Sequence, residues 1–148
     1  GLVPVEEGWF VVNAADAEWW TSPIFGSGCV FESDAAKFQQ LGINISVLGR
    51  GQPMSMYHYE SDQEDFLVLG GEALLICEGE EWRLRQWDFV HCPAGTEHVI
   101  VGAGNEAATP AIVVSRGAAG DGSSGIVSSP CPPLTPNKIV SIAISGCQ

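Results

Sequence analysis

The pattern of hydrophobic and polar positions changes near residue 41. From there to about residue 115, short apolar segments alternate with Gly, Pro and acidic turns: LGINISVL, SMYHYE, DFLVLGGEALLICEG, EWRLRQWDFVHC, HVIVGAG and AIVVS. Apolar side chains recur in them at every second position, the period of a strand with one buried face. Evenly spaced short strands of this kind predict an all-β sandwich or barrel.

The first forty residues show a different pattern. Residues 9–20, WFVVNAADAEWW, predict a short strand that turns into a short helix near Asn13, a good N-cap residue. CVFES at 29–33 predicts a strand, and the following SDAAKF predicts a helical turn. We therefore expect a short helical segment ahead of the strands.

The last thirty residues change composition again. From about residue 117 the chain is rich in Gly, Ser and Pro, which predicts an extended segment, and Ile139–Ile144 near its end suits one more strand. The chain then divides into an N-terminal strand and helix segment packed on a barrel (1–40), the barrel core (41–116) and a C-terminal tail with a last strand (117–148).

Size and charge limit the function classes. A chain of 148 residues with 45% hydrophobic residues suits one domain with a proper core. The formal net charge is −12, from 18 acidic residues against 6 Lys and Arg, and no basic stripe is present. Such a field repels phosphate backbones and anionic lipids, so we expect neither nucleic acid nor a membrane as a partner.

Targeting and cysteine signals point to the cytoplasm. No apolar run approaches the ~20 residues that span a bilayer, and no basic region followed by an apolar run marks a signal peptide. The five cysteines are odd in number and lack CxxC spacing. Scattered reduced thiols in a cytoplasmic protein are the plain interpretation.

The segment YHYESDQEDFLVLGGE (57–72) places one histidine and four acidic residues in front of an apolar run. On a strand, His58 and Glu60 point to the same face, and Glu64 can return to it after the turn at 61–63. His98, which follows Pro93-Ala-Gly95, can come from a neighbouring strand. Two imidazoles and two carboxylates that converge inside a barrel would suit a divalent metal. The alternatives are a structural histidine and a solvated acidic turn.

The spacing of these residues resembles the two motifs of the cupin family. The first motif is present as His58-x-Glu60-x3-Glu64-x6-Gly71, with Gly51 upstream, and the second as Trp87-x5-Pro93-x-Gly95-x2-His98. The resemblance covers about residues 41–115. It implies an all-β fold built on a single jelly-roll β-barrel.

Three positions depart from the family pattern. Glu60 stands where the family has its second histidine, Trp87 replaces a glycine, and Gly102 replaces an asparagine. The resemblance implies that His58, Glu64 and His98 hold one divalent metal. Glu60 is then a fourth ligand, a general base beside the metal, or a side chain turned to solvent. A carboxylate in place of an imidazole shifts the preference toward Mn²⁺ or Fe²⁺, with Zn²⁺ as the third candidate.

A metal with three or four protein ligands keeps open positions, which favours a small metalloenzyme acting on a small organic molecule. The family includes dioxygenases, isomerases and lyases, and nothing in the sequence selects among them. The alternative is a non-catalytic module that binds a small molecule. The resemblance also implies a homodimer, for which 138–145 would offer an edge strand. His91 and Cys92 are expected in the core or behind the metal ligands.

Overall fold

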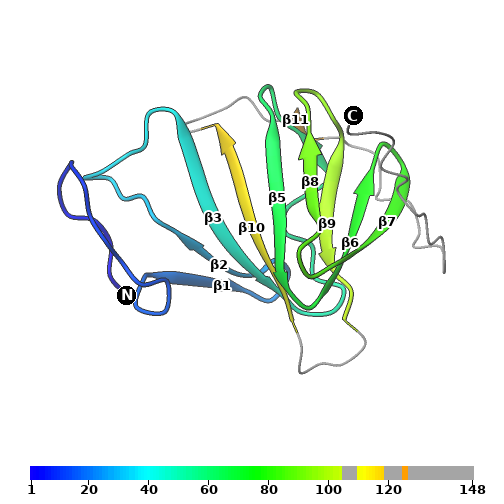
Figure 1. Cartoon of the computed structure of the whole chain (residues 1–148), viewed down its shortest axis with the longest axis horizontal. Coiled ribbons are helices and arrows are strands. Elements are labelled where there is room, and N and C mark those ends of the chain that lie inside the picture. Colours follow the sequence, from blue (N-terminus) through cyan, green and yellow to red (C-terminus); the bar gives the residue numbers. More distant parts are fainter. Residues whose placement is uncertain (105–109, 119–124, 127–148) are drawn as a thin grey trace, which may run out of the picture.

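The computed structural model describes residues 1–104, 110–118 and 125–126, which form two β-sheets (Figure 1). The larger sheet has the strand order β1-β2-β3-β10-β5-β8, and the smaller has the order β11-β4-β9-β6-β7. The bounds are β1 Trp19–Ser22, β2 Gly26–Val30, β3 Leu41–Leu48, β4 His58–Tyr59, β5 Glu64–Gly70, β6 Glu72–Cys77, β7 Glu80–Arg85, β8 Phe89–Cys92, β9 His98–Gly102, β10 Ala111–Ala118 and β11 Gly125–Ile126.

The core lies between the two sheets. Phe66, Val68 and Val113 project from the six-stranded sheet and belong to one buried cluster with Leu75 and Ile100 of the five-stranded sheet. Each is at most 7% exposed. Because successive side chains of a strand point to opposite faces, this inward set also defines which residues face outward.

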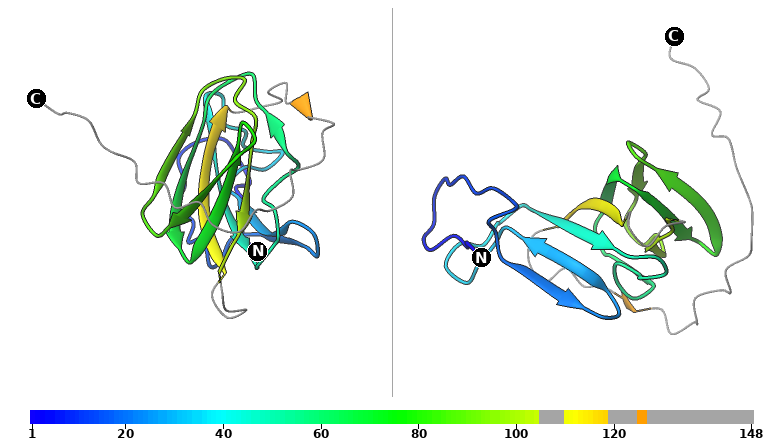
Figure 2. Two further views of the ribbon diagram at one scale, coloured as in Figure 1. Left: turned by 90° about the vertical axis from the view of Figure 1, so that its right-hand side faces the viewer. Right: turned by 90° about the horizontal axis from the view of Figure 1, so that it is seen from below.

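The all-β prediction is confirmed, but the closed barrel is not. Among the described strands, none of the six-stranded sheet pairs with one of the five-stranded sheet. β1 and β2 extend the larger sheet beyond its partner, and the N-terminal segment lies at that end, away from β6 and β7 (Figure 2). The fold is therefore an open sandwich, because the larger sheet continues where the smaller one has no strand to pair with it.

The predicted N-terminal helix is wrong, since the described residues contain no helix. Asn13 instead closes a single turn: its side chain accepts a hydrogen bond from the Ala15 amide, and its carbonyl accepts one from Asp16. One turn fixes several residues for few hydrogen bonds and does not propagate without a longer segment behind it. Here the chain enters β1 at Trp19, a residue type that favours strands.

Of the tail, the structure describes residues 117 and 118, which end β10, and β11, which pairs with β4. The strand predicted within 138–145 lies outside the described residues, and the division at 1–40, 41–116 and 117–148 stays a prediction. Within the described part of the chain, no helix is long and apolar enough to cross a membrane.

Two of the departures from the family pattern have a backbone explanation. A Cβ atom at Gly102 would lie 2.2 Å from the Gly49 carbonyl oxygen, so an asparagine side chain has no room there. Trp87 adopts φ 74°, a left-handed conformation that glycine takes without strain. Trp87 is 68% exposed, so its larger side chain extends into solvent.

Candidate metal centre

Strand pairing in the five-stranded sheet sets two histidines side by side. His58 on β4 is the direct cross-strand partner of His98 on β9. Direct partners in an antiparallel pair point to the same face, and the two imidazole ring centres lie 4.9 Å apart. His98 is almost fully buried and also packs edge-on against Phe66.

Each histidine has one ring nitrogen tied to its own backbone. The Nδ1 atom of His58 lies 2.8 Å from the Met56 carbonyl oxygen, and that of His98 lies 2.9 Å from the Thr96 carbonyl oxygen. A carbonyl can only accept, so each Nδ1 carries the proton and each Nε2 in the neutral ring keeps its lone pair. This is the arrangement in which histidine binds a metal through Nε2.

Glu64 reaches the same point from the opposite sheet. Its Oε2 atom lies 2.9 Å from His98 Nε2 and 3.6 Å from His58 Nε2. Although Glu64 Oε2 and His98 Nε2 are close and buried, neither has a hydrogen-bond partner of acceptable geometry. Buried polar atoms are seldom left this way. Both atoms therefore have unused bonding capacity directed into one small space.

These three residues fit a divalent cation. His58, Glu64 and His98 each offer one ligand atom, and the three atoms lie within 4.8 Å of one another. Two imidazoles and one carboxylate are the donors that Mn²⁺, Fe²⁺ and Zn²⁺ accept in proteins. A three-ligand set leaves coordination positions open for another molecule.

Glu60 stands beside this group rather than within it. Its Oε1 atom lies 3.5 Å from His58 Nε2, and its carbonyl accepts a hydrogen bond from the Gly95 amide. That bond joins the first motif to the second. Burial and the neighbouring Glu64 carboxylate raise the pKa of Glu60, although His58 and His98 oppose the rise. A carboxyl group with a raised pKa suits proton transfer near neutral pH.

The surroundings of His98 favour a protonated ring in the metal-free site. Burial lowers the pKa of this ring, but the Cys92 thiol, the Glu64 carboxylate and the Thr96 carbonyl outweigh it and raise the pKa to about 10. The proton compensates part of the negative charge that Glu60 and Glu64 bring into the interior. A divalent cation would replace it with a larger positive charge.

The comparisons with known proteins agree with this geometry. Residues 44–114 match the Cupin domain family, a span that contains both motifs and all four candidate residues. Residues 44–114 of the chain are therefore a cupin domain. The resemblance drawn from the two motifs is thereby confirmed.

Solved cupin structures show the same fold. A sugar phosphate isomerase from Silicibacter pomeroyi has 20% identity and a TM-score of 0.65, with 81% of this chain and 83% of that chain covered. KdgF from a Halomonas species has 20% identity and a TM-score of 0.60, with 75% and 93% covered. An RmlC-like cupin from Shewanella frigidimarina has 13% identity and a TM-score of 0.61, with 77% and 94% covered. At these identities the likeness shows the fold alone. No curated protein matches the chain.

Behind the metal centre of this cupin, on the outer face of the same strands, lies a second polar group. Asp65, the neighbour of Glu64, points outward and accepts bonds from His91 at 2.6 Å, Arg116 at 2.7 Å and Gln63 at 3.0 Å. The His91 hydrogen bond is the largest cause that lowers the pKa of Asp65, with Arg116 and Gln63 adding to it against burial. His91 was expected in the core or behind the ligands, yet its side chain is 50% exposed, whereas Cys92 is buried.

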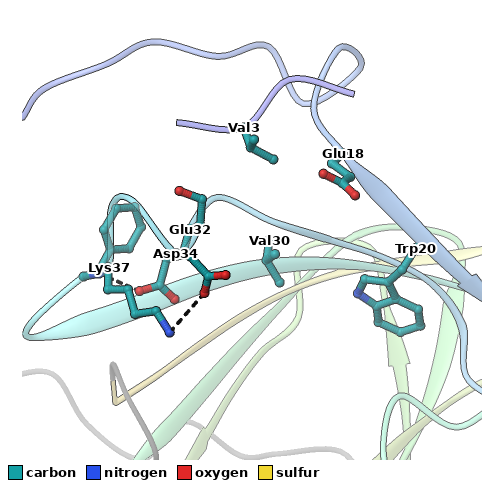
Figure 3. Close-up of a pocket in the computed structure, with 9 residues that line it drawn as sticks. Val3, Glu18, Trp20, Val30, Glu32, Asp34 and Lys37 are labelled. Atoms are coloured by element: carbon teal, nitrogen blue, oxygen red, sulfur yellow. Dashed lines mark hydrogen bonds and ion pairs between the residues drawn. The ribbon is translucent and has the colours of Figure 1, made fainter. Parts of the chain in front are cut away.

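A cavity of about 850 Å³ lies apart from the metal centre, between the N-terminal segment and the β1–β2 end of the cupin (Figure 3). Trp20 and Val30 line it together with the carboxylates of Glu18 and Glu32. Lys37, the cation drawn in Figure 3, lies 3.7 Å from Asp34. None of the candidate metal ligands lines this cavity, so it takes no part in the chemistry described above.

Proposed function

We propose that this cupin is a small metal-dependent enzyme of the isomerase type that acts on a small hydroxylated carbonyl compound. The carrying observation is the pair of buried atoms without hydrogen-bond partners, Glu64 Oε2 and His98 Nε2, which lie 2.9 Å apart. A similar fold in a sugar phosphate isomerase supports the choice of reaction type.

Each residue has a role that follows from its surroundings. His58, Glu64 and His98 would hold one divalent metal, which would polarise a substrate oxygen when bound. The backbone bonds at Nδ1 of both histidines keep their Nε2 atoms aimed inward. Glu60 would take a proton from the carbon next to the carbonyl and return it to the former carbonyl carbon, while the proton of the neighbouring hydroxyl would pass to the former carbonyl oxygen, so no net proton is gained or lost.

Metal content tests the site. We expect purified protein to carry about one divalent ion per chain, and His98→Ala or Glu64→Ala to lose it, because each removes a ligand atom. His91→Ala is the matched control, since it removes the third histidine of the chain, which lies on the outer face. Equal metal content in the parent, His98→Ala and Glu64→Ala would overturn the site.

Turnover tests the chemistry. Aldose and ketose panels, with and without phosphate, should show interconversion by the metal-loaded protein. Glu60→Gln should keep the metal and lose activity by about 10²–10⁴-fold, because an amide cannot accept the proton. Binding of a panel member without turnover, unchanged by Glu60→Gln, would favour the non-catalytic binding module instead.

A further inference from the structure

Two cysteines from different sheets lie behind the candidate metal centre. Cys77 is the last residue of β6 and the direct cross-strand partner of His98 on β9. Cys92 is the last residue of β8 and the direct partner of Glu64 on β5. Direct partners in an antiparallel pair point to the same face. Each cysteine therefore points inward beside one of two candidate ligands, whose Nε2 and Oε2 atoms lie 2.9 Å apart.

The two thiols contact each other across the space between the sheets. Cys92 belongs to the buried apolar cluster, and Cys77 packs against that cluster from the other sheet. The Cys92 thiol is within hydrogen-bonding reach of both the Cys77 thiol and the His98 ring. Hydrogen-bonded thiols are directed at each other, so a small adjustment of both side chains brings the sulfur atoms to the ~2.05 Å of an S–S bond.

The members of this pair differ in their access to solvent. Cys92 is 2% exposed, whereas Cys77 is only partly buried, so a small reagent reaches Cys77 first. Burial and the neighbouring Cys92 raise the pKa of Cys77 to about 11, so both a reagent and time are needed for its reaction near neutral pH. Cys29, the other cysteine in the described part of the chain, is buried on β2 and donates to the Val30 carbonyl at 3.8 Å.

We propose that Cys77 and Cys92 are a site of reversible oxidation, at which a disulfide forms between β6 and β8. The oxidant is a low-molecular-weight disulfide. Cys77 gives up its proton and its sulfur attacks the reagent, whose S–S bond breaks; one half leaves and takes up the proton as a thiol. Cys92 then attacks the Cys77 sulfur in the same way and releases the second half as a thiol. Two protein thiols are oxidised, and one small disulfide is reduced to two thiols.

The position of the pair connects its redox state with the metal centre. Because Cys77 pairs with His98 and Cys92 pairs with Glu64, a disulfide would hold the two strands that carry these ligands at a fixed separation. Buried disulfides between two packed sheets occur in immunoglobulin domains, so such a bond is compatible with a sandwich. The proposal does not depend on the isomerase reaction, since it concerns only the two thiols and the strands that hold them.

Oxidised glutathione, added to the folded full-length chain, tests the proposal. Cys131→Ser and Cys147→Ser are introduced first, so that the cysteines left are those at described positions. We expect the loss of two thiols, a mass about 2 Da below that of the reduced chain, and no glutathione retained. Trypsin cleaves after Arg83 and Arg85, between Cys77 and Cys92, so the disulfide should appear as a link between two separate peptides. Dithiothreitol should restore both thiols.

Cys77→Ser and Cys29→Ser form a matched pair of variants. Cys77→Ser should lose the linked peptides, and its place at the partly exposed end of β6 lets it fold. Cys29→Ser should keep them. The equilibrium constant of unfolding in urea should be about 100-fold smaller for the oxidised protein, because the disulfide closes a loop of about 15 residues. A glutathione adduct on Cys77 that leaves Cys92 free would overturn the proposal, as would a disulfide that includes Cys29 or one that does not raise the stability.

Discussion

Metal uptake by this cupin should be coupled to the release of one proton. The pKa of His98 in the metal-free site is raised to about 10, and imidazole binds a metal only in its neutral form. At pH ~7.5, roughly one ring in 300 is neutral, and removing the proton costs about 3 kcal/mol of binding free energy. The dissociation constant should therefore fall about tenfold per pH unit, and about 100-fold between pH ~7.5 and ~9.5.

The pH window lies below the pKa of His98, so its ring is mostly protonated before the ion binds and must lose that proton on binding. Isothermal titration of the metal-free protein with Mn²⁺, in buffers of different ionisation enthalpy, counts the protons released per ion. We expect about one at pH ~8, and His91→Ala should not change the number. A dissociation constant that stays flat over this range, with no proton released, would refute the reasoning.

The same proton affects the stability of the metal-free protein. Because the folded pKa of His98 lies above its unfolded value, the stabilisation is fully present below pH ~6.5 and is lost as the pH rises toward 10. Thermal unfolding of the metal-free protein should therefore move to lower temperature across that range. His98→Ala should remove this dependence.

Three further variants test the fold. Trp87→Gly should stabilise the protein by about 0.5–1 kcal/mol in urea unfolding, because it relieves the left-handed backbone at φ 74°; a loss of stability would contradict this. Asp65→Asn should cost about 2–3 kcal/mol by leaving Arg116 and His91 poorly paired. The pKa of Asp65 is lowered in the fold, so the stability that its carboxylate contributes is present above pH ~3.9 and is lost as the pH falls. The free energy of unfolding of Asp65→Asn should therefore be lower than that of the parent near neutral pH and should fall less on acidification. Gly102→Ala should cost more than about 3 kcal/mol or prevent folding, because its Cβ would meet the Gly49 carbonyl oxygen at 2.2 Å; tolerance would show that the loop can move.

The alternation of apolar and polar residues predicted the β-fold, but it could not predict which strands pair. The alternation around Glu64 places that residue and Phe66 on one face, as the structure shows. Alternation alone does not say that β4 pairs with β9, which is what sets His58 beside His98. The resemblance of the motif spacing to the family pattern implied that His58 and His98 lie together. The register of β4 against β9 is the structural reason.

The sequence did not show which of two adjacent residues on β8 faces inward. His91 and Cys92 are adjacent, and an isolated four-residue strand does not reveal which one faces inward. The pairing of β8 with β5 decides it, because Cys92 lies opposite the inward Glu64 and His91 opposite the outward Asp65. The helix predicted at Asn13 was wrong for another reason. The Asn13 side chain caps a turn as readily as a helix, and no periodic segment follows to tell the two apart.

In the open sandwich, the candidate metal ligands come from both sheets. Glu64 belongs to the six-stranded sheet, whereas His58 and His98 belong to the five-stranded sheet, and no described strand joins one sheet to the other by backbone pairing. An ion shared by these three side chains would be a cross-link between two layers whose facing side chains are mainly apolar. Loading the site would then fasten the layers at one end of the sandwich, in the way that a disulfide fastens two segments of a small secreted domain.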